Sequence, residues 1–390
     1  MPAQTYTPLE MIERLIDFDT TSRLSNLALI DFIADYLAGH GVESTRVFDA
    51  SGEKANLYAT LGPEQDGGVV LSGHTDVVPV DGQDWASDPF ILARRDDKLY
   101  GRGTADMKSF SAIALALVPE FLARGLDIPV HFALSYDEEV GCLGAPQLVS
   151  LLRDLPYTPQ AVIVGEPTLM KLVDRHKGAA RFRTTVTGLE IHSAYTDRGV
   201  SAILFAGRVI AFLDRIAAGF RAAGDPDSGF DPPYHTLHIG TIHGGTADNI
   251  VPRHCAFNWE IRLMPGGDVE TDLLDPLAAF VDKEVLPEMH AVSTETGVVT
   301  ERLATMAGLA PMKGSPAEAL VRQLTGDNSP PGAVSYGTEA GLFQRGGIPT
   351  VVCGPGSILR AHKPDEYIEV EQVEACIAFM HRLMDHVCTR

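Results

Sequence analysis

The sequence predicts an α/β fold in which a mixed, largely parallel sheet is flanked by helices and interrupted by a smaller inserted domain. Three short apolar segments, at 68–73, 130–135 and 161–165, are typical of strands buried in a parallel sheet. A helical pattern at 109–124 separates the first two, as expected where strands and helices alternate. With 390 residues, of which 45% are hydrophobic, the chain is long enough for two packed domains.

The apolar patterns divide the chain into three parts. Residues 1–178 are expected to form the first part of a catalytic domain, 179–305 an inserted domain, and 306–390 the second part of the catalytic domain. The inserted domain has the β-α-β-β-α-β order of a ferredoxin-like fold. Its expected strands are 181–187, 236–241, 254–263 and about 294–302, and its expected helices are 202–217 and 269–285. The other elements expected are helices at 9–18, 27–40, 317–324 and 370–387, and strands at 55–61 and 350–353.

Charge and composition exclude several classes of partner. A formal net charge of −21, with no basic run to offset it, disfavours binding to nucleic acid or to anionic membranes. The longest apolar run, near 112–118, is too short to span a bilayer. Five scattered cysteines without a CxxC pair are typical of reduced thiols. We therefore expect a cytoplasmic protein that acts on a small molecule.

Acidic and imidazole side chains follow each of the three apolar strands. His74 follows the first strand, Glu138 and Glu139 the second, and Glu166 the third, while Asp106 lies in a glycine-containing turn that opens a helix. The carboxyl ends of parallel strands meet at one edge of a sheet, where ligands bind. Each residue alone is weak support, because a single histidine is more often structural and a Glu-Glu pair more often solvated.

Together these residues suit a centre of two divalent cations. Imidazole and carboxylate ligands favour zinc, with cobalt or manganese also compatible, and a two-metal site needs one bridging carboxylate. Asp76, two residues after His74, is expected to accept a hydrogen bond from the ring nitrogen that does not bind metal.

Five segments of the chain form a further pattern: GHTDVVP (73–79), YGRGTADMK (100–108), DEEVG (137–141), GEPT (165–168) and AHKPDEY (361–367). In this order they resemble the zinc amidohydrolases and metallopeptidases, a family that includes deacetylases, desuccinylases, aminoacylases and glutamate carboxypeptidases. The resemblance implies that His74 and Glu166 hold one metal, that Glu139 and His362 hold the other, and that Asp106 bridges them. It also implies that Glu138 is the general base in amide hydrolysis.

The resemblance further implies that the inserted domain is a lid and dimerisation domain of a homodimer. His192, in the segment GLEIHSA, is then expected to stabilise negative charge on the substrate carbonyl oxygen, from its own or the partner subunit. The alternative is that His192 only caps the helix that begins near Ser201.

Four other histidines of the inserted domain lie close together in the sequence. They lack an interleaved set of carboxylates, so we do not expect them to bind metal. They are His235, His238, His243 and His254.

Substrate contacts are expected from both domains. The backbone N–H of Gly356, in GPGS (354–357), would receive a substrate carboxylate, and Asn249 and Arg262 are the contributors expected from the inserted domain. Arg262 is equally compatible with an ordinary surface arginine on a strand. Glu339 offers an anionic group to a substrate ammonium, which the negative net charge also favours.

The segment SYGTEAGLF (335–343) narrows the expected substrate. It resembles the members of the family that cleave the acetyl amide of N-acetylornithine to ornithine and acetate, a step of arginine biosynthesis. The alternatives are a related N-acyl-amino-acid hydrolase, a desuccinylase or a dipeptidase. A non-catalytic homologue that binds metal or an amino acid is a further alternative, but all predicted ligands and the predicted base are present.

Overall fold

In a computed structural model, which describes residues 4–388, the chain forms two compact units. The first comprises Met1–Arg175, Leu309–Gly332 and Thr338–Arg390, and the second His176–Gly308 and Ala333–Gly337. The short segment Ala333–Gly337 belongs to the second unit although the rest of that unit ends at Gly308. No apolar pattern marks this return in the sequence.

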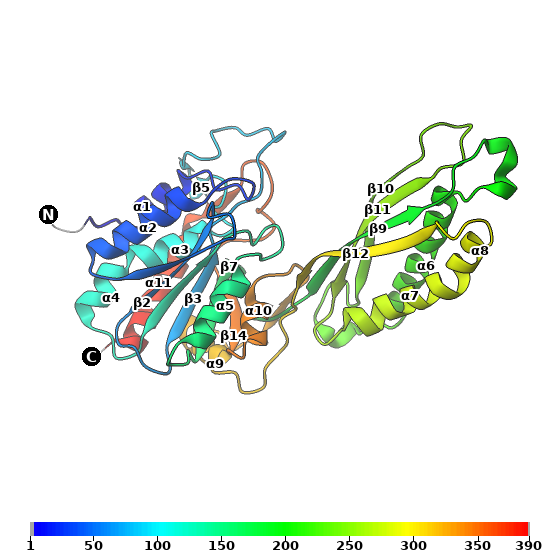
Figure 1. Cartoon of the computed structure of the whole chain (residues 1–390). Helices are drawn as coiled ribbons and strands as arrows, with labels where there is room; N and C mark the ends of the chain where they lie inside the picture. Colours follow the sequence, from blue (N-terminus) through cyan, green and yellow to red (C-terminus); the bar gives the residue numbers. More distant parts are fainter. Residues whose placement is uncertain (1–3, 389–390) are drawn as a thin grey trace. The chain divides into compact units, whose positions relative to one another are not determined.

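The first unit is built on an eight-stranded mixed sheet with the strand order β1-β2-β6-β3-β7-β14-β8-β13 (Figure 1). The last residue of β8 and the last two residues of β13 belong to the second unit. Its central strands β6, β3, β7 and β14 are parallel to one another, and all their residues are buried, which explains their continuous apolar sequences. The strands are β1 (Ser44–Phe48), β2 (Ala55–Leu61), β3 (Val69–His74), β6 (Val130–Ser135), β7 (Ala161–Pro167), β8 (Val173–His176), β13 (Gly332–Val334) and β14 (Thr350–Gly354).

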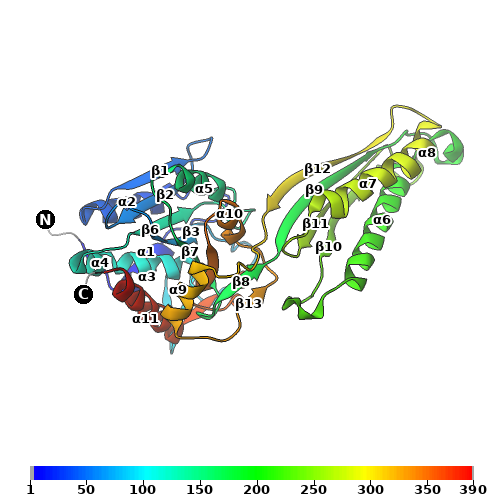
Figure 2. The same ribbon diagram turned by 90° about the horizontal axis from the view of Figure 1, so that it is seen from below.

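Helices cover both faces of this sheet. Figures 1 and 2 show α3 and α11 on one face and α5 and α10 on the other. The helix expected at 109–124 is two helices, because Pro119 lacks an N–H and can stand only in the first turn of the second one. The helices are α1 (Pro8–Ile16), α2 (Leu27–Gly39), α3 (Lys108–Ala116), α4 (Val118–Arg124), α5 (Ala145–Asp154), α9 (Pro316–Thr325), α10 (Ala340–Arg345) and α11 (Val370–Val387).

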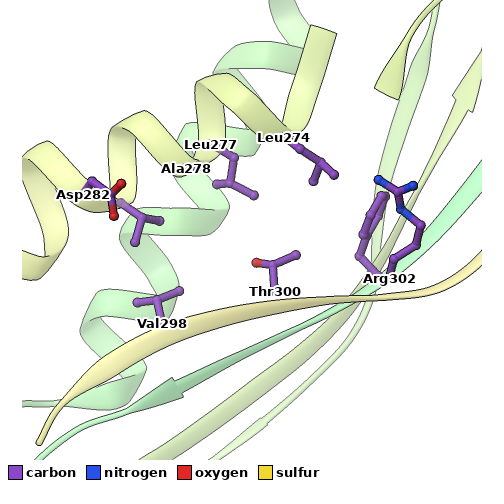
Figure 3. A pocket seen from close by; sticks show the side chains of 9 residues that line it. Leu274, Leu277, Ala278, Asp282, Val298, Thr300 and Arg302 are labelled. Atoms are coloured by element: carbon purple, nitrogen blue, oxygen red, sulfur yellow. The ribbon is translucent and has the colours of Figure 1, made fainter. Parts of the chain in front are cut away.

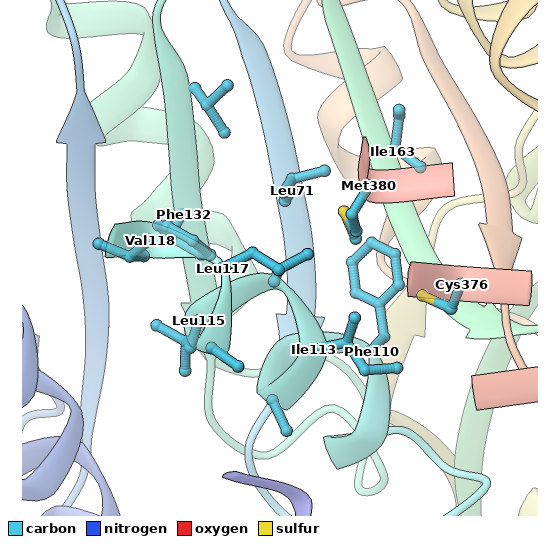
Figure 4. Close-up of a cluster of buried hydrophobic side chains, with 14 of the residues drawn as sticks. Leu71, Phe110, Ile113, Leu115, Leu117, Val118, Phe132, Ile163, Cys376 and Met380 are labelled. Carbon is cyan, nitrogen blue, oxygen red and sulfur yellow. The ribbon is translucent and has the colours of Figure 1, made fainter. Parts of the chain in front are cut away.

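The core between the sheet and α3 fixes the position of that helix (Figure 4). Phe110 of α3 lies directly over Gly165 of β7, where an added Cβ would come within 2.0 Å of the phenyl ring. Glycine is therefore required next to Glu166, and the close contact ties the start of α3 to the end of β7. Other buried side chains in this layer are Leu71, Ile113, Phe132, Ile163, Cys376 and Met380.

A separate three-stranded sheet with the order β15-β5-β4 also belongs to the first unit. Its strands are β4 (Ala93–Arg95), β5 (Lys98–Tyr100) and β15 (Tyr367–Glu369). They are only three residues long, so the sequence pattern did not predict them. The loop after β5 carries Asp106, and the loop before β15 carries His362.

The second unit is an antiparallel four-stranded sheet, in the order β10-β11-β9-β12, with helices packed on it (Figure 2). In its core Trp259 stacks on Phe182 at a centroid distance of 4.4 Å and donates a hydrogen bond to Thr184 Oγ1 at 2.9 Å. The elements confirm the predicted β-α-β-β-α-β order and fold class. They are β9 (Gly178–Thr187), α6 (Ala202–Ala222), β10 (Thr236–Gly244), β11 (His254–Leu263), the consecutive helical segments η3 (Glu270–Leu274), α7 (Asp275–Phe280), η4 (Val281–Val285) and α8 (Leu286–His290), and β12 (Gly297–Met306).

Within residues 4–388, no helix has the length and apolar character needed to cross a membrane.

Candidate metal centre

The carboxyl ends of the parallel strands bring the first group of predicted ligands together. His74 is the last residue of β3, and Glu166 lies near the end of the adjacent strand β7. The Nε2 atom of His74 is 3.0 Å from Asp106 Oδ1 and 3.7 Å from Glu166 Oε1. All three residues are at least 95% buried.

The second group meets the first at Asp106. His362 Nε2 lies 3.2 Å from Asp106 Oδ2 and 3.1 Å from Glu139 Oε2. The carboxylate of Asp106 is therefore placed between two imidazoles, with one oxygen toward each. This is the pairing that the family resemblance implies, although the assignment of each ligand stays a prediction.

Glu138 is buried beside both groups. One of its carboxylate oxygens lies with donor atoms of His74 and Glu166 in a group whose members are all within 4.8 Å of one another. The thiol of Cys142 is 3.4 Å from Glu138 Oε1 and donates to it. Burial raises the pKa of Glu138 well above its usual range, and the nearby carboxylate of Glu139 raises it further. A carboxylate with a raised pKa is suited to accept and return a proton near neutral pH.

Asp76 has a different role from the one expected. The carbonyl oxygen of Asp76, 2.8 Å from His74 Nδ1, accepts the hydrogen bond that leaves Nε2 to face the other ligands, while the carboxylate is 3.6 Å away. The carboxylate instead accepts hydrogen bonds from the backbone N–H groups of Glu138 at 3.0 Å and Glu139 at 3.3 Å, and from Ser22 Oγ at 2.7 Å. The carboxylate of Asp76 therefore positions the backbone of Glu138 and Glu139, because the backbone carbonyl of Asp76 already satisfies the imidazole.

The electrostatics of the centre fit divalent cations. Three buried carboxylates, those of Asp106, Glu138 and Glu166, and the partly buried carboxylate of Glu139 face two imidazoles. Burial raises the pKa of Glu166 well above its usual range. Hydrogen bonds to Asp106 and Glu139 raise the pKa of His362 to about 10. Carboxylates this close repel one another unless protons or cations lie among them. All the donor atoms are nitrogen or oxygen, so the residues fit the predicted class of metal.

The residues expected from the inserted domain all belong to the second unit. His192 Nδ1 accepts a hydrogen bond from the N–H of Ala194 at 3.1 Å and so caps the short 3-10 helix η1 (Ser193–Arg198). Ser201 caps α6 through its own hydroxyl, so the alternative that His192 caps this helix is wrong. The carbonyl of Asn249 accepts a hydrogen bond from the N–H of Ser193 at 2.9 Å, which places Asn249 beside the His192 turn.

Arg262 is engaged within its own strand. Its guanidinium donates to the two oxygens of Glu260 at 3.2 and 3.4 Å. Residues two apart on a strand share a face, so this pairing matches the alternative of a surface arginine. A substrate carboxylate would have to compete with Glu260 for this group.

Two expected substrate contacts are corrected by the structure. Glu339 is 1% exposed, and its carboxylate accepts hydrogen bonds from Ser72 Oγ and, at 2.7 Å, from Ser135 Oγ. It therefore supports the strand ends that lead to His74 and Glu138 and does not present a free anion to a substrate ammonium. The N–H of Gly356 donates to Gln372 Oε1 at 3.2 Å and is already used. The sequence could not show these three partners, because none of them is a neighbour along the chain of the residue that it contacts.

The four clustered histidines of the second unit form no such centre. Within the described part of the chain, the groups of three or more metal-ligating side chains are the two around His74. His235 is used structurally, since its Nδ1 accepts a hydrogen bond from the N–H of Met264 at 2.8 Å. A cavity of about 550 Å³ in the second unit is lined mainly by apolar side chains between the α7 region and β12, with Asp282 and Arg302 as its charged groups (Figure 3). Its lining contains one carboxylate and no histidine or cysteine, so it does not resemble the group of side chains around His74.

Comparison with known proteins identifies the family. Residues 70–386 match the model of peptidase family M20/M25/M40. The chain belongs to this family. It is 37% identical to an acetylornithine deacetylase from Myxococcus xanthus, over 97% of this chain and 96% of that protein. The prediction of a metal-dependent hydrolase of the amidohydrolase and metallopeptidase family is confirmed.

Solved structures of other proteins share the fold. A tripeptidase from Staphylococcus aureus superposes with a TM-score of 0.76 at 18% identity and 99% coverage of both chains. A dinuclear metal-binding peptidase of the M20 family from Bacillus subtilis superposes with a TM-score of 0.62 at 16% identity and 97% coverage of both.

Several residues that hold the proposed site in place were not predicted from the sequence. Ser72 and Ser135, which hold Glu339, lie in strands that read only as apolar runs. Arg102 and Glu366 form a fully buried ion pair between two of the family segments. Arg102 lies in the segment 100–108 and Glu366 in the segment 361–367. A charged residue inside such a segment that is not itself a predicted ligand was the only sign in the sequence that these two residues support the site.

Metal binding should release protons. Burial lowers the pKa of His74, but its hydrogen bond to Asp106 and the charges of the nearby carboxylates raise it well above its usual range, and the pKa of His362 is raised to about 10. A metal ligand must be deprotonated, so a proton carried by either ring has to leave when metal binds. The apparent affinity for zinc should therefore fall as the pH is lowered. Calorimetric titration in buffers of different ionisation enthalpy measures the protons released per ion.

The variants His362→Gln and His243→Gln test whether the released protons come from the proposed metal centre. The first should release fewer protons than the wild type, whereas the second, which changes an exposed histidine of the second unit, should match it. A binding enthalpy that does not depend on the buffer would contradict the expectation.

Proposed function

We propose that this chain is a two-metal deacetylase that hydrolyses N-acetylornithine to ornithine and acetate, as in arginine biosynthesis. The observation that carries the proposal is the placement of Asp106 between His74 and His362, with Glu138 buried beside them. The near full-length relative from Myxococcus xanthus, named an acetylornithine deacetylase, supports the choice of substrate.

The proposed ligands divide the centre into two halves. His74 and Glu166 would hold one ion, Glu139 and His362 the other, and Asp106 would bridge them. Zinc is proposed as the native metal, with cobalt or manganese as alternatives. Bound divalent cations supply Lewis acidity, which polarises an amide carbonyl and makes water more acidic.

The protein's own groups then carry the proton chemistry. Glu138 takes a proton from the attacking water, whose oxygen forms a bond to the acetyl carbon. It then gives this proton to the amide nitrogen as the C–N bond breaks. The remaining hydroxyl proton of the acid passes to the amine, so that acetate and the ammonium form of ornithine leave. Cys142 and the backbone contact to Asp76 hold the Glu138 carboxyl in place. His192 is proposed to donate a hydrogen bond to the carbonyl oxygen as negative charge develops there.

A substrate panel tests the proposed specificity. The metal-loaded protein should cleave N-acetylornithine with a higher kcat/KM than acetylcitrulline, acetylmethionine or succinyl-diaminopimelate. A preference for acetylmethionine or the succinyl compound would instead support a general N-acyl-amino-acid hydrolase or a desuccinylase. Because solved structures with this fold include a tripeptidase, dipeptides and tripeptides belong in the panel. No hydrolysis of any compound by fully loaded protein would support a non-catalytic homologue.

The pair Glu138→Gln and Glu139→Gln separates the roles of the two neighbouring carboxylates. Glu138→Gln should retain two ions per chain but lose about 10²–10⁴-fold in kcat, because only the proton acceptor is removed. Glu139→Gln should lose metal, because it removes a proposed ligand. Metal analysis of the purified variants and initial rates provide the two readouts. Near wild-type turnover by Glu138→Gln would reject its assignment as the base.

A cytoplasmic homodimer is proposed as the working form, with the second unit as the lid and dimerisation domain. All five cysteines are free and buried, which suits a reducing compartment. The turn that carries His192 and Asn249 is largely exposed in a single chain and displays Tyr195 and Ile250, which are 51% and 39% exposed.

Sedimentation velocity tests the proposed dimer and should show a species of twice the chain mass. A monomer at all concentrations that support full activity would contradict the dimer.

A further inference from the structure

The loop that carries Asp106 and the loop that carries His362 are joined at one point in the first unit. Strands β5 and β15 pair in antiparallel register, with Tyr100 opposite Tyr367. The N–H of Gly101 donates to the carbonyl of Glu366 at 3.0 Å, which continues the pairing by one step. The two loops therefore leave the same end of this short ladder toward the proposed metal centre.

The side chain of Glu366 is surrounded by donors from the Asp106 loop. Its Oε1 atom accepts three backbone hydrogen bonds, from Gly103 at 3.0 Å, Ala105 at 2.9 Å and Asp106 itself at 3.2 Å. Gly103 has a φ of +87°, in the left-handed region that glycine favours, and this lets the loop curl around the carboxylate. Successive N–H groups that converge in this way form an anion-binding nest.

The second oxygen of Glu366 is also occupied. Arg102 Nη1 donates to Oε2 at 2.5 Å, and both side chains are 1% exposed. Because both oxygens are engaged by donors, Glu366 has no free oxygen with which to bind a metal. Its negative charge instead cancels the buried positive charge of Arg102 beside a centre that has to attract cations.

Arg102 extends the connection to the backbone of His362. Its Nη2 atom donates to Gln83 Oε1 at 2.7 Å, and Gln83 Nε2 donates to the carbonyl of His362 at 3.1 Å. His362 has a φ of +63°, an unusual conformation for a residue that is not glycine, and this chain of hydrogen bonds helps to hold it. One buried carboxylate is thus tied to both loops whose side chains meet at the centre.

We propose that Glu366 is a positioning residue of the metal centre, which holds the Asp106 and His362 loops in register so that both side chains bind metal together. The inference rests on the proposed two-metal centre but not on the proposed substrate. Partners that orient metal ligands from behind in this way typically contribute about 10–100-fold to metal affinity. Glu366→Gln replaces an acceptor by an NH₂ group, so one of the four donors now meets another donor.

The test is calorimetric titration of the metal-free full-length chain with Zn²⁺ against a competing chelator. Glu366→Gln should bind at least one of two ions about 10–100-fold more weakly than the wild type, and added zinc should restore much of the lost activity. The control variant Glu371→Gln makes the same chemical change at an exposed position in the first turn of α11 and should bind zinc as the wild type does. Rescue by zinc separates positioning from general loss of structure.

Circular dichroism and thermal unfolding establish that the variants are folded. If Glu366→Gln does not fold, Arg102→Lys keeps the charge of the pair but removes the fork that reaches Gln83, and it should show a smaller loss in the same direction. Wild-type zinc affinity and stoichiometry in a folded Glu366→Gln, or in Arg102→Lys if that is the variant used, would overturn the proposal. Absence of zinc binding by the wild type would instead overturn the proposed two-metal centre.

Discussion

The carboxylate of Asp106, held between the imidazoles of His74 and His362, is the interaction on which the rest of the site depends. Each of its oxygens lies 3.0–3.2 Å from a ring nitrogen of a different histidine. A buried carboxylate in that position needs positive charge on both sides, and two divalent cations supply it without placing protons on the ligands. The parallel strands, the start of α3 and the β5–β15 ladder all serve to bring these three side chains to one place.

Most of the proposed ligands could be brought together from the sequence because their signal is local. His74, Glu138, Glu139 and Glu166 stand at or just after continuous apolar runs, and parallel strands have their carboxyl ends on the same edge of the sheet. His74 and Glu166 are examples, since both stand at the ends of strands whose residues are all buried. His362 follows no such strand and was found by resemblance alone, because the short strand β15 after it has no distinctive pattern.

The supporting contacts could not be predicted because they depend on the direction of atoms that are distant in sequence. The backbone oxygen of Asp76 serves His74, whereas its carboxylate serves Glu138 and Glu139, and no spacing rule distinguishes the two. Glu339 carried a plausible charge for a substrate, yet Ser72 and Ser135 from two different strands occupy it. In the second unit the sequence left Arg262 equally compatible with a substrate contact and with an ordinary surface arginine. Its contact with Glu260, two residues away on the same strand, matches the second of these.

The most direct measurement is anomalous X-ray diffraction at the zinc absorption edge from crystals of the zinc-loaded chain. Two peaks roughly 3.5–4 Å apart are expected, one beside His74 and Glu166 and the other beside Glu139 and His362, with the carboxylate of Asp106 between them. A single peak, or peaks among the histidines of the second unit with none at Asp106, would contradict a dinuclear centre bridged by this residue.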